Sequence, residues 1–190
     1  MKSSGCLTLW RSVILTNILS SFASADALNL LAELFPDETI HIPQAVEKEL
    51  QVALVHGKTH VERVLQALEA GGIQPIKLTE AERLLMPTLP AKLHAGEREA
   101  IVICQARQHL FLTNDKRAVR YCKLNGIDTL KLEMLLRLLW IRRIMSQDEV
   151  KTLIGTMATV EKLVLSQKQR DIIFAPRRSH RRRRRRRRKS

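Results

Sequence analysis

Short apolar, β-branched runs alternate with amphipathic segments along most of the chain. The runs that predict strands cover residues 12–15, 39–42, 73–78, 110–113 and 127–130. Apolar residues at helical spacing predict helices over 27–35, 44–56, 59–70, 96–107, 116–124, 132–144 and 146–159. Prolines at 87 and 90 indicate a loop. This alternation predicts an α/β domain with helices on both faces of a central, mainly parallel sheet.

The beginning of the chain allows two interpretations. Lys2, an apolar stretch and the small residues Ala23–Ala25 resemble a secretory signal, but Arg11 interrupts the apolar stretch. We therefore interpret it as a strand that runs into a helix. About 18 uninterrupted apolar residues are needed to cross a bilayer, and none are present. Three cysteines, two of them among apolar residues, predict a reduced, cytoplasmic protein rather than a disulfide scaffold.

The charge of the chain is concentrated at its C-terminal end. The formal net charge is +14, and residues 177–190 contain eleven basic and no acidic residues, which leaves +3 for residues 1–176. We expect an extension at 1–11, a domain at 12–175 and a disordered, arginine-rich tail at 176–190. The nucleic-acid-binding candidates in this tail are Arg181, Arg182, Arg183, Arg184, Arg185, Arg186, Arg187 and Arg188. Three interpretations of the tail stay open: an arm that tethers RNA, a solvated extension with no role, or an end extended by a shifted reading frame. An aromatic content of 4% argues against a multi-residue base-stacking platform.

Acidic residues are expected near the carboxyl ends of the predicted strands, where parallel sheets carry their working sites. Asp115 follows the strand at 110–113. Glu97 lies at the beginning of the helix at 96–107, which precedes that strand, and Glu49 lies in the helix after the second strand. Asn17 follows the first strand. Carboxylates brought together repel one another unless a cation lies among them, and oxygen donors favour Mg²⁺ or Mn²⁺. Such an ion activates water and polarises a phosphodiester. Taken singly, each acid is also compatible with a solvated helix residue or an N-cap.

Four segments in order, VILTNILSSFASADALNLLAELF, IHIPQAVEKEL, LHAGEREAIVICQA and LFLTNDKRAVRYCKLNGI, resemble PIN-domain proteins. The resemblance implies a PIN-like three-layer α/β/α fold and a metal-dependent nuclease that acts mainly on RNA, a hydrolase found among toxins of toxin–antitoxin pairs. It also implies a site of four acidic residues that bind Mg²⁺ or Mn²⁺. Glu49, Glu97 and Asp115 match three of them, both as catalytic residues and as metal ligands, and Asn17 and Thr113 match supporting polar positions.

The fourth acidic position departs from the family pattern. An Asp usually precedes the Thr–Asn of the first strand end, where this chain has Leu15. A substitution and a one-residue deletion explain this equally well, and Asp26 is not expected to substitute. The sequence therefore predicts a weakened ribonuclease or, alternatively, an inactive nucleic-acid- or antitoxin-binding module. The candidate partners are RNA, an antitoxin and a second copy of the chain. Residues 132–144 and 150–165 offer an apolar partner surface, although we favour their interpretation as core helices.

Overall fold

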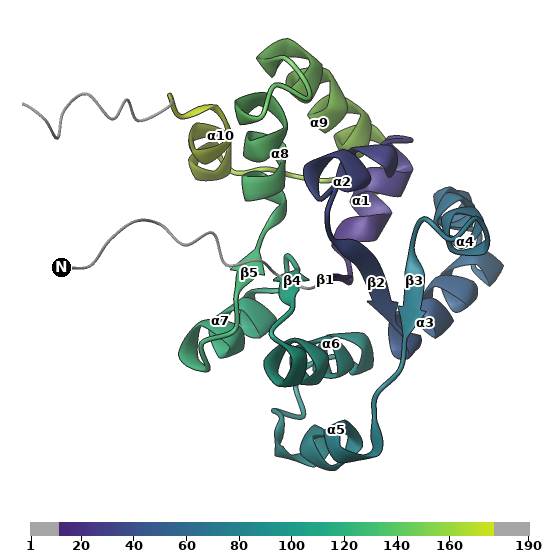
Figure 1. Cartoon of the computed structure of the whole chain (residues 1–190). Coiled ribbons are helices and arrows are strands. Elements are labelled where there is room, and N and C mark those ends of the chain that lie inside the picture. Colours follow the sequence, from purple (N-terminus) through teal and green to yellow (C-terminus); the bar gives the residue numbers. More distant parts are fainter. Residues whose placement is uncertain (1–11, 177–190) are drawn as a thin grey trace, which may run out of the picture.

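The computed structural model describes residues 12–176, and within them five parallel strands form one sheet (Figure 1). The strands are β1 (Ser12–Leu15), β2 (Thr39–Pro43), β3 (Gln74–Ile76), β4 (Leu110–Leu112) and β5 (Thr129–Leu130). Their order across the sheet is β3-β2-β1-β4-β5, and every neighbouring pair is parallel. The predicted parallel sheet is confirmed, and all of its carboxyl ends lie at the same edge.

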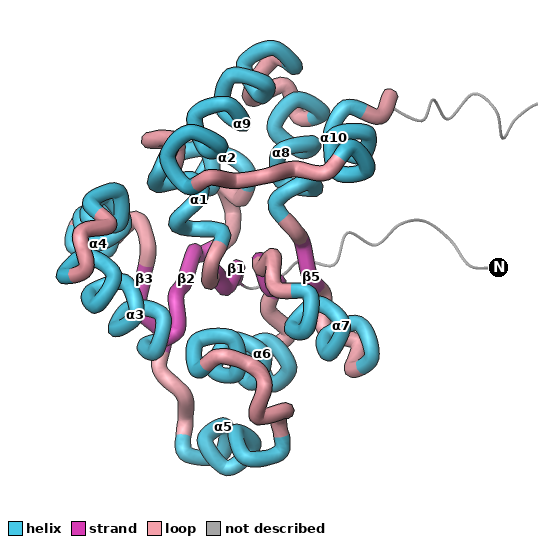
Figure 2. Tube along the Cα trace, turned by 180° about the vertical axis from the view of Figure 1, so that it is seen from behind, coloured by secondary structure: helices cyan, strands magenta, loops and turns pink. Residues whose placement is uncertain are grey.

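Helices cover both faces of the sheet (Figure 2). The helices are α1 (Ile18–Ser24), α2 (Asn29–Leu34), α3 (Gln44–Val55), α4 (Glu62–Glu69), α5 (Glu80–Leu85), α6 (Ala95–Arg107), α7 (Lys116–Leu124), α8 (Leu132–Ile141), α9 (Gln147–Glu161) and α10 (Gln167–Phe174). Helices α1, α2, α8, α9 and α10 lie on one side of the sheet and α5, α6 and α7 on the other, while α3 and α4 lie beside β2 and β3. The three-layer α/β/α expectation is confirmed. Among the described helices, none is long and apolar enough to cross a membrane.

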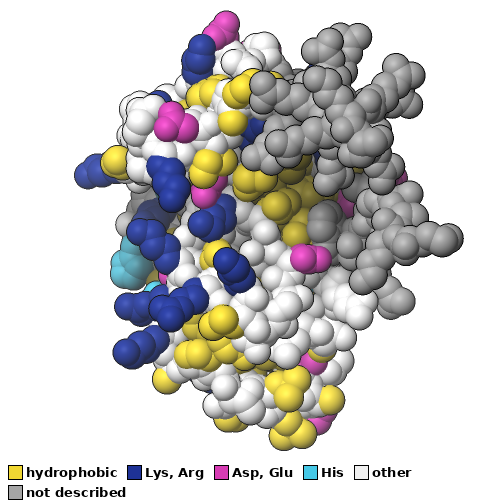
Figure 3. All heavy atoms as spheres, turned by 90° about the vertical axis from the view of Figure 1, so that its left-hand side faces the viewer, with side chains coloured by type: hydrophobic (Ala, Val, Ile, Leu, Met, Phe, Trp, Pro, Cys, Tyr) yellow, Lys and Arg dark blue, Asp and Glu magenta, His cyan; other side chains and the backbone are white. Residues whose placement is uncertain are grey.

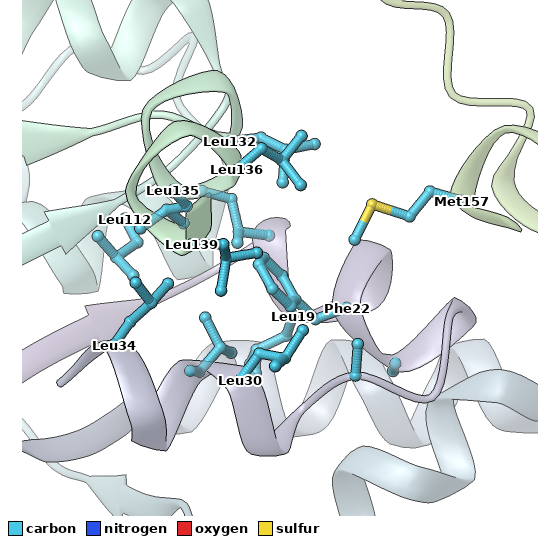
Figure 4. Packing of buried hydrophobic residues seen from close by; sticks show 14 of the residues in the cluster. Leu19, Phe22, Leu30, Leu34, Leu112, Leu132, Leu135, Leu136, Leu139 and Met157 are labelled. Atoms are coloured by element: carbon cyan, nitrogen blue, oxygen red, sulfur yellow. The ribbon is translucent and has the colours of Figure 1, made fainter. Parts of the chain in front are cut away.

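The core consists of two apolar clusters, one on each face of the sheet. Along β4, Leu110 and Leu112 belong to the larger cluster and Phe111 to the smaller one, because successive strand residues point to opposite faces. Figure 4 shows leucines of α8 meeting those of α1 and α2 in the larger cluster. The buried residues that α8 and α9 contribute to it are Leu132, Leu135, Leu136, Leu139, Val150, Leu153, Ile154 and Met157. The interpretation of these two stretches as core helices is therefore confirmed.

Helix α5 replaces part of the loop expected before Pro87 and Pro90. The hydroxyl of Thr79 accepts a hydrogen bond from the backbone N–H of Glu82, whose carboxylate accepts one from the N–H of Thr79, so a capping box begins the helix. The buried Glu82 carboxylate also receives two hydrogen bonds of 2.6 Å from Arg107 of α6, which lowers its pKa to about 2. Six residues are too few to show a periodic apolar pattern, which is why the sequence did not predict α5. The ion pair joins residues 25 positions apart, so no local pattern indicated it.

Helix α10 also went unpredicted, and α8 holds its C-terminal end. Arg137 donates hydrogen bonds to the carbonyls of Ile172 and Ala175, and the indole N–H of Trp140 donates to Ile173. Cations favour the carbonyl end of a helix, where the last C=O groups have no partner within the helix. The segments 1–11 and 177–190, which contain the predicted N-terminal extension and nearly all of the predicted tail, lie outside the described residues. The described part of the signal-like stretch forms β1 and α1, so its interpretation as a strand that runs into a helix is confirmed.

Helices α3 and α6 approach each other very closely at Gly96. A Cβ atom on Gly96 would lie 2.5 Å from Cγ2 of Val46 and 3.4 Å from Oε1 of Glu49. Because 2.5 Å is well inside van der Waals contact, any larger residue at position 96 has to push the helices apart. The absence of a side chain at Gly96 thus sets the spacing between α3 and α6.

We expect Gly96→Ala to lower the free energy of unfolding by about 1–3 kcal/mol, the usual cost of overpacking. Chemical denaturation followed by circular dichroism measures it. Gly155→Ala is the matched control, because Gly155 lies in α9 with nothing within 4 Å of its added Cβ. The control should gain about 0.5–1 kcal/mol from the better helix former. Equal stability of the two variants would contradict this account, and Gly96→Ala combined with Val46→Ala should recover part of the loss.

Candidate functional site

A cavity of about 370 Å³ opens at the carboxyl ends of the strands and is bordered by Glu49, Glu97 and Asp115. We call it the acidic cavity. Its other lining residues are Thr16, Asn17, Ser20, Val46, Leu50, Ala53, Lys58, Val61, His94 and Gly96. The structure thus brings to one cavity the three acids that the sequence singled out, which come from α3, α6 and the turn between β4 and α7.

Glu49 and Glu97 reach the cavity through the contact between α3 and α6. At this contact each helix offers a carboxylate to the first turn of the other: Glu49 accepts from the N–H of Gly96 (3.4 Å), and Glu99 accepts from that of Ala45 (2.9 Å). Both bonds satisfy N–H groups that lack partners within their own helix. Glu97 accepts from the N–H of His94 at 3.2 Å, which holds its side chain at the beginning of α6.

Asp115 is the N-cap of α7. Its Oδ1 accepts hydrogen bonds of 2.7 Å from the N–H groups of Arg117 and Ala118. The turn before it is held by the buried Thr113, whose hydroxyl accepts from the N–H of Asp115 at 3.2 Å. The predicted N-cap role and the lining of the cavity therefore occur together in this one residue.

Asn17 and Asn114 join three strand ends. The side-chain oxygen of Asn17 accepts from the backbone N–H of Asn114 at 3.0 Å, and that of Asn114 accepts from Leu132 at 2.9 Å. These bonds connect the ends of β1 and β4 with the beginning of α8, directly after β5. Asn114 was not among the predicted supporting residues, although its position directly before Asp115 was available as a signal.

Sequence reasoning also missed Thr16 and Lys58 as lining residues. Thr16 is 6% exposed, and its hydroxyl has no hydrogen-bond partner within the described part of the chain. A buried hydroxyl without a partner is unfavourable, so this oxygen has donor capacity left for a ligand of the cavity. Its position beside Asn17 was a signal for Thr16. Nothing local identified Lys58, which lies in the loop after α3.

The buried position of Glu97 makes its negative charge unfavourable. Glu97 is 6% exposed, and burial raises the pKa of its carboxyl group above the usual value. The charge of Asp115 adds to the rise, and that of Glu49 adds a smaller contribution, while the hydrogen bond from His94 opposes it. Asp115 and Glu49 thus lie near enough to Glu97 to make its negative charge less favourable.

The donor atoms of these acidic side chains are of the type that hard divalent cations prefer. The three carboxylates and the Thr16 hydroxyl offer oxygen only, which suits Mg²⁺ or Mn²⁺. One oxygen of each carboxylate accepts hydrogen bonds from backbone N–H groups, one in Glu49 and Glu97 and two in Asp115, and the second oxygen accepts no hydrogen bond from residues 12–176. However, in that same stretch no group of three or more His, Cys, Asp or Glu side chains is close enough together to hold an ion. An ion would therefore have to draw the carboxylates closer.

The first strand end contributes no acid to the cavity. Leu15 ends β1 in register with Leu112 of β4, at the position where the family resemblance implies an Asp. Asp26 is not among the residues that line the cavity, and its carboxylate forms an ion pair of 3.0 Å with Arg63. As expected, Asp26 does not take the place of the missing residue.

The comparison with known families agrees with this arrangement. A family model described as a PIN domain matches residues 11–174. The chain belongs to the PIN-domain family. No curated protein gives a significant match. The match supports a nuclease-type module of the PIN family.

We expect Asp115→Asn to lower the pKa of Glu97, because the variant removes a neighbouring negative charge. Asn remains a good N-cap, so α7 should stay folded. A carboxyl-detected NMR titration of both proteins measures the change. Asp148→Asn, which alters an exposed acid of α9, is the control and should leave the Glu97 pKa unchanged.

The direction of the pH effect follows from the raised pKa. A carboxyl group whose pKa is higher in the folded than in the unfolded protein contributes stability below its unfolded value, and this contribution is lost as the pH rises through the folded value. Glu97 of the PIN domain therefore opposes folding toward neutral pH. A Glu97 pKa that does not change in Asp115→Asn would show that the two carboxylates are not coupled.

Proposed function

We propose that this PIN-domain protein is a Mg²⁺- or Mn²⁺-dependent endoribonuclease with weak activity. The observation that carries the proposal is the convergence of Glu49, Glu97 and Asp115 on one cavity at the carboxyl ends of a parallel sheet. When bound, a divalent ion supplies charge neutralisation and activates water for attack on a phosphodiester. The free oxygens of the three carboxylates would hold the ion, and the Thr16 hydroxyl would hydrogen-bond to a ligand beside it.

The proposed weakness of the activity follows from the first strand end. Leucine offers neither a charge nor an oxygen to an ion, so a site with Leu15 has one ligand fewer than the family pattern. Lower metal affinity and less activated water are the expected consequences.

A second candidate function is a PIN-fold module that binds nucleic acid or an antitoxin without cleaving RNA. Two observations favour it: Leu15, and the lack of a ready-made group of three metal-binding side chains within residues 12–176. An antitoxin and a second copy of the chain remain partner proposals that rest on the family resemblance. The apolar faces of α8 and α9 do not support them, since those faces lie in the core.

Leu15→Asp separates the two candidates by gain of function. We expect the wild-type protein to cleave fluorescein-labelled single-stranded RNA slowly in Mn²⁺, and Leu15→Asp to do so at least about tenfold faster, since even outer-shell partners of a metal change activity by that much. Leu15→Asn is the matched control, because it adds a polar group of the same size without the charge. Asp115→Asn should abolish cleavage in both backgrounds.

A thermal-shift measurement shows whether the ion binds at this site. Saturating Mn²⁺ should raise the melting temperature of the wild-type protein, more so of Leu15→Asp and not of Asp115→Asn. If the wild-type protein and Leu15→Asp are equally inert toward varied RNAs in saturating Mn²⁺, the nuclease proposal is wrong and the binding module is the better description.

The arginine-rich tail is a separate part of the proposal and rests on sequence alone. If Arg181–Arg188 tether RNA, deleting residues 177–190 should weaken RNA binding and reduce its dependence on salt, because fewer counterions are released. Fluorescence anisotropy at several salt concentrations measures this. An unchanged salt slope would remove the tail from the mechanism.

A further inference from the structure

A second depression lies between the loop at residues 90–93 and helix α7. Its volume is about 380 Å³, and its lining includes Leu93, Tyr121 and Leu124. Leu124 is 76% exposed, and Tyr121, the single tyrosine of the chain, is partly buried. We call this depression the α7 groove. Its lining thus includes two leucines and one aromatic residue.

Cations border the α7 groove. Lys92, Arg117 and Arg120 line it, and Lys116 and Lys123 belong to the same helix. No Asp or Glu occurs in residues 86–96 or 116–127. Lysine and arginine side chains gather along one side of the molecular face that includes α7 (Figure 3). Such a surface attracts a polyanion.

The α7 groove and the acidic cavity are neighbours along two separate segments of chain. On one segment Leu93 lines the groove and the next residue, His94, lines the cavity. On the other, Asp115 lines the cavity and Arg117 lines the groove. The guanidinium of Arg117 donates a hydrogen bond of 3.3 Å to the carbonyl of Lys92, which joins the two segments. The linings of the cavity and of the groove therefore adjoin at these two segments.

We propose that the α7 groove binds the nucleotides that flank the acidic cavity in a single strand of RNA. Lys92 and Arg120 would contact phosphates, while the Tyr121 ring and Leu124 pack against an unpaired base. One ring provides a subsite for one base and not an extended platform. The proposal deepens the proposed function and rests on it for the choice of RNA.

Two features favour a nucleic acid strand over an acidic protein segment. A strand places flat apolar bases beside phosphates, which matches a lining that combines apolar and aromatic residues with lysine and arginine. The same polyanion would continue toward the carboxylates of the acidic cavity, where phosphate is the group that the proposed reaction requires. A duplex is disfavoured, because its bases are stacked within the helix and have no free face for Tyr121.

The test uses the full chain and a short fluorescein-labelled oligouridylate in EDTA, so that binding is measured without cleavage. Lys92→Glu combined with Arg120→Glu is compared with Lys168→Glu combined with Arg170→Glu, which reverses two exposed charges on α10. Arg117 stays unchanged because it also holds the loop. The groove variant should bind at least about tenfold more weakly at low salt, with a salt slope shallower by about 1.4 for two lost phosphate contacts. The control should bind as the wild type does apart from the charge effect that the two variants share.

Photocrosslinking locates the strand independently of affinity. An oligouridylate that contains 5-iodouridine should crosslink to the α7 peptide at Tyr121, and Tyr121→Phe should retain the crosslink because it keeps the ring. Equal affinity of the groove and control variants, or crosslinks confined to other segments, would overturn the proposal. Equally effective competition by poly-glutamate would also overturn it, since it would identify a general polyanion surface.

These outcomes are separable from the fate of the nuclease proposal. If the α7 groove does not bind RNA but Leu15→Asp gains Mn²⁺-dependent cleavage, the groove proposal fails alone. If the groove binds RNA and no variant cleaves it, the nuclease proposal fails and the protein is a binding module.

Discussion

The close contact between α3 and α6 is the constraint on which the acidic cavity depends. Gly96 lets the two helices approach until Val46 occupies the space of a missing Cβ, and the Glu49 carboxylate then accepts the N–H of Gly96. The next residue is Glu97, so the same contact places two carboxylates at one wall of the cavity. A larger residue at position 96 would disturb both the core and the site, since a closely packed interior transmits such a displacement.

The carboxylates of the cavity have structural partners even without an ion. Asp115 caps α7, Glu97 caps the beginning of α6, and Glu49 bonds to α6 from the neighbouring helix. Their mutual repulsion, which contributes to the raised pKa of Glu97, is thereby partly offset by favourable interactions with helix N-termini. This arrangement explains how the acids can converge on one cavity in the folded chain. It also leaves the second oxygen of each carboxylate free for an ion.

Negative and positive side chains line two adjacent depressions at this edge of the sheet: carboxylates line the acidic cavity, and lysine and arginine line the α7 groove. Asp115 and Arg117 are two residues apart, yet one faces the cavity and the other the groove, because α7 begins between them. Carboxylates suit a metal ion and repel phosphate, whereas arginine and lysine attract phosphate at longer range. The proposed RNA strand would therefore be attracted by the groove rather than by the cavity.

The sequence by itself determined the strands and the long helices, because the spacing of apolar residues depends only on near neighbours in the chain. It also indicated Glu49, Glu97 and Asp115, through their positions near predicted strand ends and through the family resemblance. It missed α5 and α10, which are short and held by distant partners, Arg107 and Arg137. It did not identify Thr16 or Lys58 as lining residues, and it gave no sign of the α7 groove. Only the tertiary structure decided these features, since Glu49 and Gly96 are 47 residues apart and meet only when two helices pack without an intervening side chain.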